Sequence, residues 1–156
     1  MQNHEDLIHT FYRAFAKGNV DEMLQCYHDS IRFEDPAFGV LHGNEARNMW
    51  RMLVRPGIKI TYHNVEVKDG KGSADWIAEY QFGEARRKVK NKIHAEFEFA
   101  DGKISRHTDS FNLAKWTRQA LGSTGWAFGW TPWFQRKIRS STRARLTAFS
   151  QKLKGN

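Results

Sequence analysis

The sequence predicts an α+β fold in which helices pack on one face of a curved antiparallel sheet. Up to residue 53, apolar side chains recur at helical spacing in three segments, whereas residues 58–111 alternate apolar and polar side chains as strands do. The turn dipeptides Asp69-Gly70 and Asp101-Gly102 separate these strands, so we expect hairpins. Three helices followed by long strands favour a cone with a ligand-binding mouth.

The N-terminal half predicts three helices and one strand. Residues 4–17 form the first helix, with an apolar stripe of Leu7, Ile8, Phe11, Tyr12 and Phe15. Residues 20–27 form a second, short helix. Residues 31–35 alternate as a strand that Pro36 ends, and residues 39–43 read as a loop between glycines. Asn44 is expected to cap a third helix, which Pro56-Gly57 stops.

The second half predicts strands and then a helical extension. Strands are expected over residues 58–68 and 73–82, followed by a basic connection over residues 83–92. The final hairpin joins residues 93–99 to a strand whose one face carries Ser105, His107, Asp109 and Phe111. Beyond it we expect a helix over residues 111–121, an aromatic, glycine-rich segment over residues 122–134, and a basic helix over residues 135–153.

Composition and charge fit one globular domain, residues 1–156, with a core of about residues 4–112 and an extension over residues 113–156. The net charge is +8. The residues after Asn112 include nine Lys and Arg and no Asp or Glu, so the residues before it include 16 basic and 17 acidic side chains. The single Cys26 excludes an intrachain disulfide, and neither a signal peptide nor a membrane-spanning apolar run is evident, so we expect a cytoplasmic protein.

The basic, aromatic extension supports two hypotheses. In the favoured one, residues 122–134 pack across the cone mouth or against a dimer partner and act as a lid. In the other, the basic helix lies on an anionic membrane surface with Trp side chains at the interface. No recognised nucleic-acid motif accompanies the basic residues, so nucleic acid is not an expected partner.

The strand with His107 and Asp109 carries the candidate chemistry, because a carboxylate among aromatic rings has a raised pKa and can exchange protons near neutral pH. The alternative is that Asp109 lies at a wet strand end and only stabilises a turn. No third ligand accompanies the His-x-Asp pair, so no metal is expected, and no glycine-rich phosphate motif suggests a cofactor.

Residues 27–36 (YHDSIRFEDP), Leu41-His42-Gly43 and the Asp101–Asp109 stretch resemble the SnoaL-like branch of the nuclear transport factor 2-like superfamily. The resemblance covers about residues 4–112 and implies a curved-sheet cone with a pocket, as in ketosteroid isomerases, limonene epoxide hydrolases and polyketide cyclases. It places Asp35 where ketosteroid isomerases keep their general base and Asp109 where limonene epoxide hydrolases and cyclases keep a carboxylate.

The same resemblance shows departures. Phe11, with Tyr12 next to it, stands where the isomerases have their oxyanion-hole tyrosine, and Ala95 stands near where they have a protonated acid. Trp76 and Ala78 align with the Arg and Asp that the epoxide hydrolases need, unless a one-residue shift brings in Glu79.

We therefore predict a homodimeric cone that binds a small apolar molecule, with Asp109 as the acid or base, Asp35 as its partner and His107 as a tuning group. The expected pocket wall consists of Tyr12, Phe15, Phe33, Trp50, Trp76, Tyr80, Phe97 and Phe111. The chemistry would be cofactor-free isomerisation, cyclisation or hydration of a small carbonyl compound. The alternative is a non-catalytic ligand-binding or dimerisation module.

Overall fold

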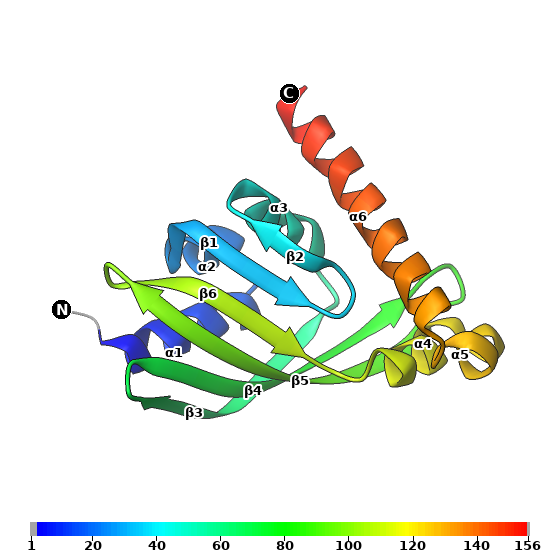
Figure 1. Cartoon of the computed structure of the whole chain (residues 1–156), viewed down its shortest axis with the longest axis horizontal. Coiled ribbons are helices and arrows are strands. Elements are labelled where there is room, and N and C mark those ends of the chain that lie inside the picture. The colour runs from blue at the N-terminus through cyan, green and yellow to red at the C-terminus, as the bar shows by residue number, and fades with distance from the viewer. Residues whose placement is uncertain (1–2, 156) are drawn as a thin grey trace.

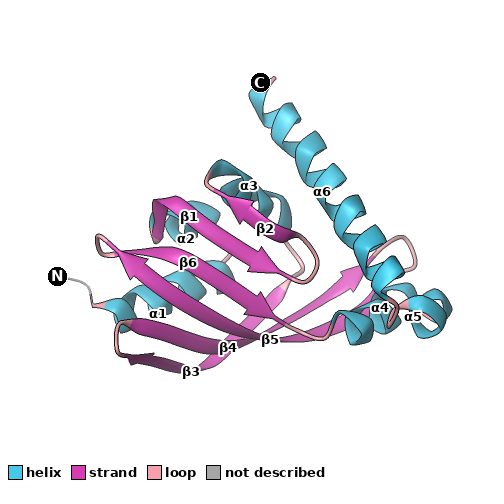
Figure 2. Cartoon of the chain, in the orientation of Figure 1, coloured by secondary structure: helices cyan, strands magenta, loops and turns pink. Residues whose placement is uncertain are grey.

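The computed structural model describes residues 3–155. Its strands form one curved sheet. Its six strands follow the order β2 (Gly39–His42), β1 (Tyr27–Asp35), β6 (Lys103–Ser110), β5 (Arg87–Ala100), β4 (Lys71–Phe82) and β3 (Lys59–Lys68) (Figure 2). β1 (Tyr27–Asp35) runs parallel to β6 (Lys103–Ser110), and the other neighbouring strands are antiparallel. The α+β prediction is confirmed, although the hairpin signals gave no indication of the parallel pair, which joins strands far apart in the sequence.

The first three helices cover the concave face of this sheet (Figure 1). They are α1 (His4–Ala16), α2 (Val20–Gln25) and α3 (Asn44–Leu53). The side chain of Asn3 caps α1 by accepting a hydrogen bond from the Asp6 amide at 2.7 Å, and the whole predicted apolar stripe of α1 is buried. The core therefore lies between these helices and the sheet.

Two strands begin or lie where the sequence pattern predicted a loop. Residues Gly39–His42 form the short strand β2 on the edge of β1, whereas a loop was expected there. β5 (Arg87–Ala100) begins inside the predicted basic connection, because its charged side chains alternate with the buried Val89. The remaining strands, β3 (Lys59–Lys68) and β4 (Lys71–Phe82), are close to their predicted ranges.

Three local expectations are corrected by the backbone. Tyr27 is the first residue of β1 and not the end of the second helix, so its ring enters the core. Gly43, with a positive φ of 55°, occupies the N-cap of α3, and Asn44 is already helical. A bulge between Glu98 and Phe99 shifts the register of β6, so that Ile104 takes the fully buried position expected for Ser105.

The C-terminal extension forms three helices: α4 (Leu113–Leu121), α5 (Ser123–Phe128) and α6 (Pro132–Lys154). The last of these, α6, begins at the capping residue Thr131 and crosses the open end of the sheet next to α3 (Figure 1). Its residues Ile138 and Leu146 are buried, while Leu153 is exposed. The extension is thus docked on the core through the first two-thirds of α6.

Candidate functional site

Two carboxyl groups meet on neighbouring strands. The parallel register pairs Phe33 with His107 and Glu34 with Thr108, so that one further residue along each strand places Asp35 beside Asp109. Adjacent strands lie about 4.8 Å apart, and both residues point to the concave face because side chains two apart share a face. The structure therefore brings together the two acids that the sequence analysis singled out.

A chain of buried hydrogen bonds fixes Asp109. Its Oδ1 lies 2.8 Å from His107 Nε2 and accepts a second bond from Trp76 Nε1 at 3.3 Å. Behind the imidazole, His107 Nδ1 lies 2.7 Å from the Tyr27 hydroxyl, which also accepts a bond from Trp50 Nε1 at 2.8 Å. His107 is completely buried, so it contacts Asp109 and not the solvent.

The number of donors in this series of hydrogen bonds determines which atom carries each proton. The Trp50 indole can only donate, so the Tyr27 oxygen accepts from it and the Tyr27 hydroxyl proton is free to go to His107 Nδ1. A neutral imidazole then carries its proton on Nε2 and donates it to Asp109. This is the one arrangement that satisfies every donor among these hydrogen bonds, and in it Asp109 accepts two N–H bonds on one oxygen.

Tyr27→Phe tests this chain through stability. Without the hydroxyl, the buried Trp50 N–H and His107 Nδ1 both lose their partner, and we expect a loss of about 2–4 kcal/mol in the free energy of unfolding. Urea unfolding measures it. Tyr62→Phe is the matched control, because the Tyr62 hydroxyl bonds only the partly buried His9 ring. Equal losses in the two variants would contradict the contribution of these buried hydrogen bonds to stability.

Asp35 lies in a turn that holds its carboxyl group. Its Oδ1 accepts hydrogen bonds from the backbone amides of Ala37 at 2.9 Å and Phe38 at 2.6 Å, which is how the chain reverses from β1 into β2. Burial raises the pKa of Asp35 to about 7; the amide bonds oppose this shift and the negative charge of Asp109 adds to it. The pair thus combines Asp35, whose pKa is raised to about 7, with Asp109, which accepts two N–H bonds.

Both acids open onto an apolar cavity of about 430 Å³. Five of the predicted wall residues line it: Phe15, Trp50, Trp76, Tyr80 and Phe111. The other three, Tyr12, Phe33 and Phe97, lie behind this wall in the core and are almost completely buried. The volume falls in the range of small-ligand pockets.

Tyr80 supplies a hydrogen-bond donor at the cavity wall. Its hydroxyl accepts a bond from Trp116 Nε1 at 2.7 Å, so its own proton remains available to a ligand. Burial raises the pKa of Tyr80, which keeps the hydroxyl protonated. Tyr12, the tyrosine next to the oxyanion-hole position that the resemblance indicated, does not line the cavity, whereas Tyr80 does.

The middle of α6 closes one side of the cavity with Ile138, Ser141, Thr142 and Arg145. Its attachment is made by side chains that donate to the carbonyl groups of the Asp35 turn: Thr142 Oγ1 to Ala37 O at 2.6 Å, and Arg143 to Phe38 O at 2.9 Å. The lid hypothesis placed the aromatic segment across the mouth or against a dimer partner. The first version is wrong, because Trp126, Trp130 and Trp133 are exposed and line no part of the cavity, while the second stays a prediction. The cover is α6 itself.

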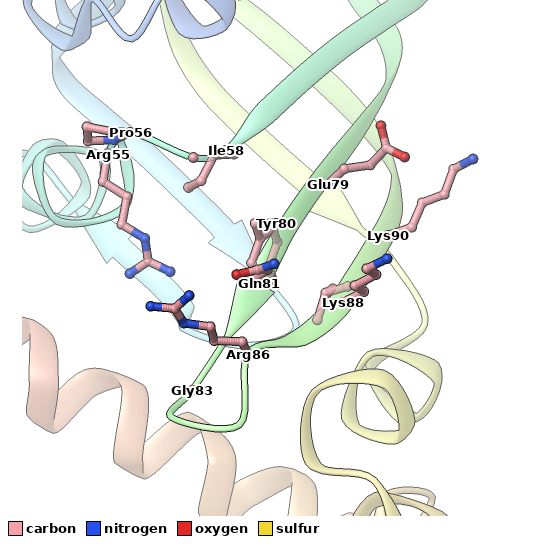
Figure 3. Close-up of a pocket in the computed structure, with 12 residues that line it drawn as sticks. Arg55, Pro56, Ile58, Glu79, Tyr80, Gln81, Gly83, Arg86, Lys88 and Lys90 are labelled. Atoms are coloured by element: carbon pink, nitrogen blue, oxygen red, sulfur yellow. The ribbon is translucent and has the colours of Figure 1, made fainter.

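A basic groove of about 900 Å³ adjoins the cavity at Arg55, Ile58 and Tyr80. Figure 3 shows Arg55 and Arg86 pointing toward one another across it. The one acid in its wall, Glu79, lies on the opposite side and pairs with Lys59 at 3.9 Å. Glu79 therefore does not enter the cavity, and the one-residue shift that would have supplied a third acid does not occur.

Sequence reasoning missed three groups that shape the site: Tyr27, Trp116 and Asn91. Tyr27 was expected in the apolar stripe of a helix and Asn91 in a connection, so neither was expected at the site. Trp116 was recognised only as part of an apolar helix stripe. Asn91 could have been found from the alternation of Val89, Asn91 and Ile93, which continues the inward face of β5.

Among residues 3–155, no group of three or more His, Cys, Asp or Glu side chains is arranged to hold a metal ion. Within the same range, no helix has both the length and the apolar character needed to cross a membrane.

The described residues thus form an α+β fold with a curved sheet, in which two neighbouring carboxyl groups open onto an apolar cavity. The profile of the SnoaL-like domain family matches residues 8–107, and the chain belongs to this family. A comparison with curated proteins found no match.

Solved structures that share the fold have low sequence identity to this chain. A nuclear transport factor 2-like protein of unknown function from Burkholderia pseudomallei has a TM-score of 0.66 at 16% identity, over 76% of this chain and 98% of that one. A polyketide cyclase assigned by inference in Silicibacter has a TM-score of 0.64 at 20% identity, over 77% and 96%. The epoxide hydrolase of limonene-hydrolase type from M. tuberculosis has a TM-score of 0.62 at 19% identity, over 78% and 90%.

Proposed function

We propose that the protein is a cofactor-independent acid–base enzyme that moves a proton at a carbon next to the carbonyl group of a small, largely apolar compound. One observation carries the proposal: two carboxyl groups lie side by side in one apolar cavity, and their environments differ. Asp109 accepts two N–H bonds, whereas the pKa of Asp35 is about 7. Pairs of acids whose proton affinities are pushed apart are suited to act as base and acid.

The geometry suggests a role for each group. Asp109 takes the proton from the carbon, and the electron pair of the broken C–H bond moves into the enolate, whose oxygen receives the Tyr80 hydroxyl bond. Protonated Asp35 then delivers a proton to the enolate carbon or to an adjacent position. The proton on Asp109 returns to Asp35 through the cavity, which restores the starting state. His107 acts through Asp109 and is a positioning residue.

The related folds support this class of chemistry without specifying the reaction. The neighbouring structures include proteins described as polyketide cyclases and as epoxide hydrolases. Epoxide hydrolysis is the less favoured of these for this chain, because Trp76 and Ala78 occupy the positions on β4 that would have to carry an Arg and an Asp. Homodimerisation and a cytoplasmic location remain predictions from the sequence.

Hydrogen exchange at carbon tests the proposal without knowledge of the product. Small cyclic ketones that raise the melting temperature of the protein, and whose uncatalysed exchange is slow, would be incubated with it in D₂O and followed by NMR. We expect deuterium to enter the position next to the carbonyl group with the wild-type protein and not with Asp109→Asn. Binding of such compounds without any exchange would contradict the enzyme and favour the alternative, a ligand-binding module.

A further inference from the structure

The large apolar side chains that are exposed in the described chain all lie in its C-terminal extension. Trp126, Trp130, Trp133 and Phe128 are each at least 50% exposed, and Phe134 packs against two of them, with ring centroids 6.3 Å from both Phe128 and Trp133. We call these five residues the aromatic platform. It forms one end of the molecule, where α5 meets the start of α6 (Figure 1).

The chain holds the platform rigidly in this outward position. Gly125 and Gly129 lie one helical turn apart and face Thr117 of α4 so closely that a Cβ atom on either would collide with it. Gln135 Nε2 donates to Gly129 O at 3.0 Å, and Thr131 caps α6 by accepting the Phe134 amide. Because the glycine side of α5 is packed inward, its aromatic side chains are directed away from the core.

Positive charge surrounds the aromatic platform. The Arg118 guanidinium lies 4.8 Å from the Trp126 ring centroid, and Lys137 Nζ lies 5.4 Å from that of Trp133. A shallow hollow beside Trp126 is lined by Arg87, Lys88 and Arg118, and it has no acidic residue in its wall. Residues 112–156 as a whole contain nine Lys and Arg residues and no Asp or Glu.

We propose that the aromatic platform docks on an anionic phospholipid surface, with its Trp side chains at the lipid–water interface and the basic hollow on lipid phosphate groups. Trp rings beside Lys and Arg are the combination that interfacial segments use. A second copy of the chain is a poorer occupant, since a two-fold contact through the platform would place two strongly basic surfaces against each other. The inference does not depend on the proposed enzyme activity.

Docking here would bring the cavity close to the bilayer. Trp116 and Leu121 of α4 and Ile138 of α6 line the cavity, and the same two helices carry the basic residues around the platform. An apolar ligand dissolved in the membrane would therefore reach the cavity over a short path.

Vesicle co-sedimentation of the full chain tests the proposal. We expect binding to phosphatidylcholine vesicles with about one-third phosphatidylglycerol, at least about tenfold weaker binding to pure phosphatidylcholine, and weaker binding at high salt. The fluorescence of the exposed Trp residues should shift to shorter wavelength on binding. The variant Trp126→Ser/Trp130→Ser/Trp133→Ser should lose binding at least about tenfold while the far-ultraviolet circular dichroism remains unchanged.

Arg136→Gln/Lys137→Gln provides a second variant that keeps the aromatic side chains, and it should also weaken binding to anionic vesicles. The matched control is Lys68→Gln/Lys71→Gln, which removes the same charge at the β3–β4 turn at the other end of the molecule. Equal binding to both kinds of vesicle, equal loss in the control, or no binding at all would overturn the proposal. So would a dimer in light scattering that the Trp variant converts to a monomer without any vesicle binding by the wild type.

Discussion

Asp109→Asn is expected to lower kcat/KM for a compound that turns over in the cavity by a factor of about 10² to 10⁴, the usual contribution of a positioned general base. The side-chain oxygen of asparagine can still accept the bonds from His107 Nε2 and Trp76 Nε1, so the fold and the cavity should be preserved. What is lost is the negative charge and the site for the transferred proton. Steady-state kinetics on a compound found by deuterium exchange would measure the effect.

Asp75→Asn is the matched control for this experiment. Asp75 lies on β4, next to Trp76, but its side chain is on the opposite face, where it contacts Asn64 and His94. We expect its kcat/KM to equal that of the wild type. If Asp109→Asn retained full activity with the cavity intact, the base would have to be another group.

Asp35→Asn is expected to make the protein more stable above neutral pH and to leave its stability below about pH 4 nearly unchanged. The folded-state pKa of about 7 lies above the ordinary value of 3.8, so the folded protein binds this proton more tightly than the unfolded chain. The resulting stabilisation is fully present below the unfolded pKa and is lost as the pH rises through the folded one. Asparagine does not titrate, so this loss disappears.

The size of the effect follows from the difference between the unfolded pKa of 3.8 and the folded pKa of about 7. Between about pH 5 and about pH 8, the difference in unfolding free energy between Asp35→Asn and the wild type should change by about 2–3 kcal/mol in favour of the variant. Urea unfolding at the two pH values measures it. Asp75→Asn should give a flat difference over the same range, because hydrogen bonds from Asn64 and His94 lower the pKa of Asp75, so that its titration lies below this range in both the folded and the unfolded chain. A flat difference for Asp35→Asn would contradict a raised pKa.

Local patterns were sufficient to predict most of the fold. The apolar stripe of α1, the alternation in β4 and the Asp101-Gly102 turn are properties of neighbouring residues, and each element forms where they indicate. The pairing of β1 with β6 is different, since it joins segments about 75 residues apart. The sequence analysis did not predict this pairing, and the resemblance to a known family supplied only the expectation that Asp35 and Asp109 share a cavity.

The remaining features of the site could not be predicted, because they depend on distances between elements. Alternation indicated that His107 is buried, but it could not indicate that Tyr27 lies within hydrogen-bond distance of it. Similarly, aromatic residues were correctly placed on the inner face, yet Phe33 and Phe97 lie in the core and Trp116 from the extension reaches Tyr80. Which ring contacts a ligand depends on the packing of the whole chain.

The attachment of α6 has a consequence for how relatives are compared. Thr142 and Arg143 hold the loop whose amides bind Asp35, and both lie beyond residue 107, where the match to the family profile ends. The acidity of a residue inside the shared region thus depends on a segment outside it. Two family members with the same pair of carboxyl groups but different C-terminal sequences are therefore expected to differ in the pKa of the residue that corresponds to Asp35.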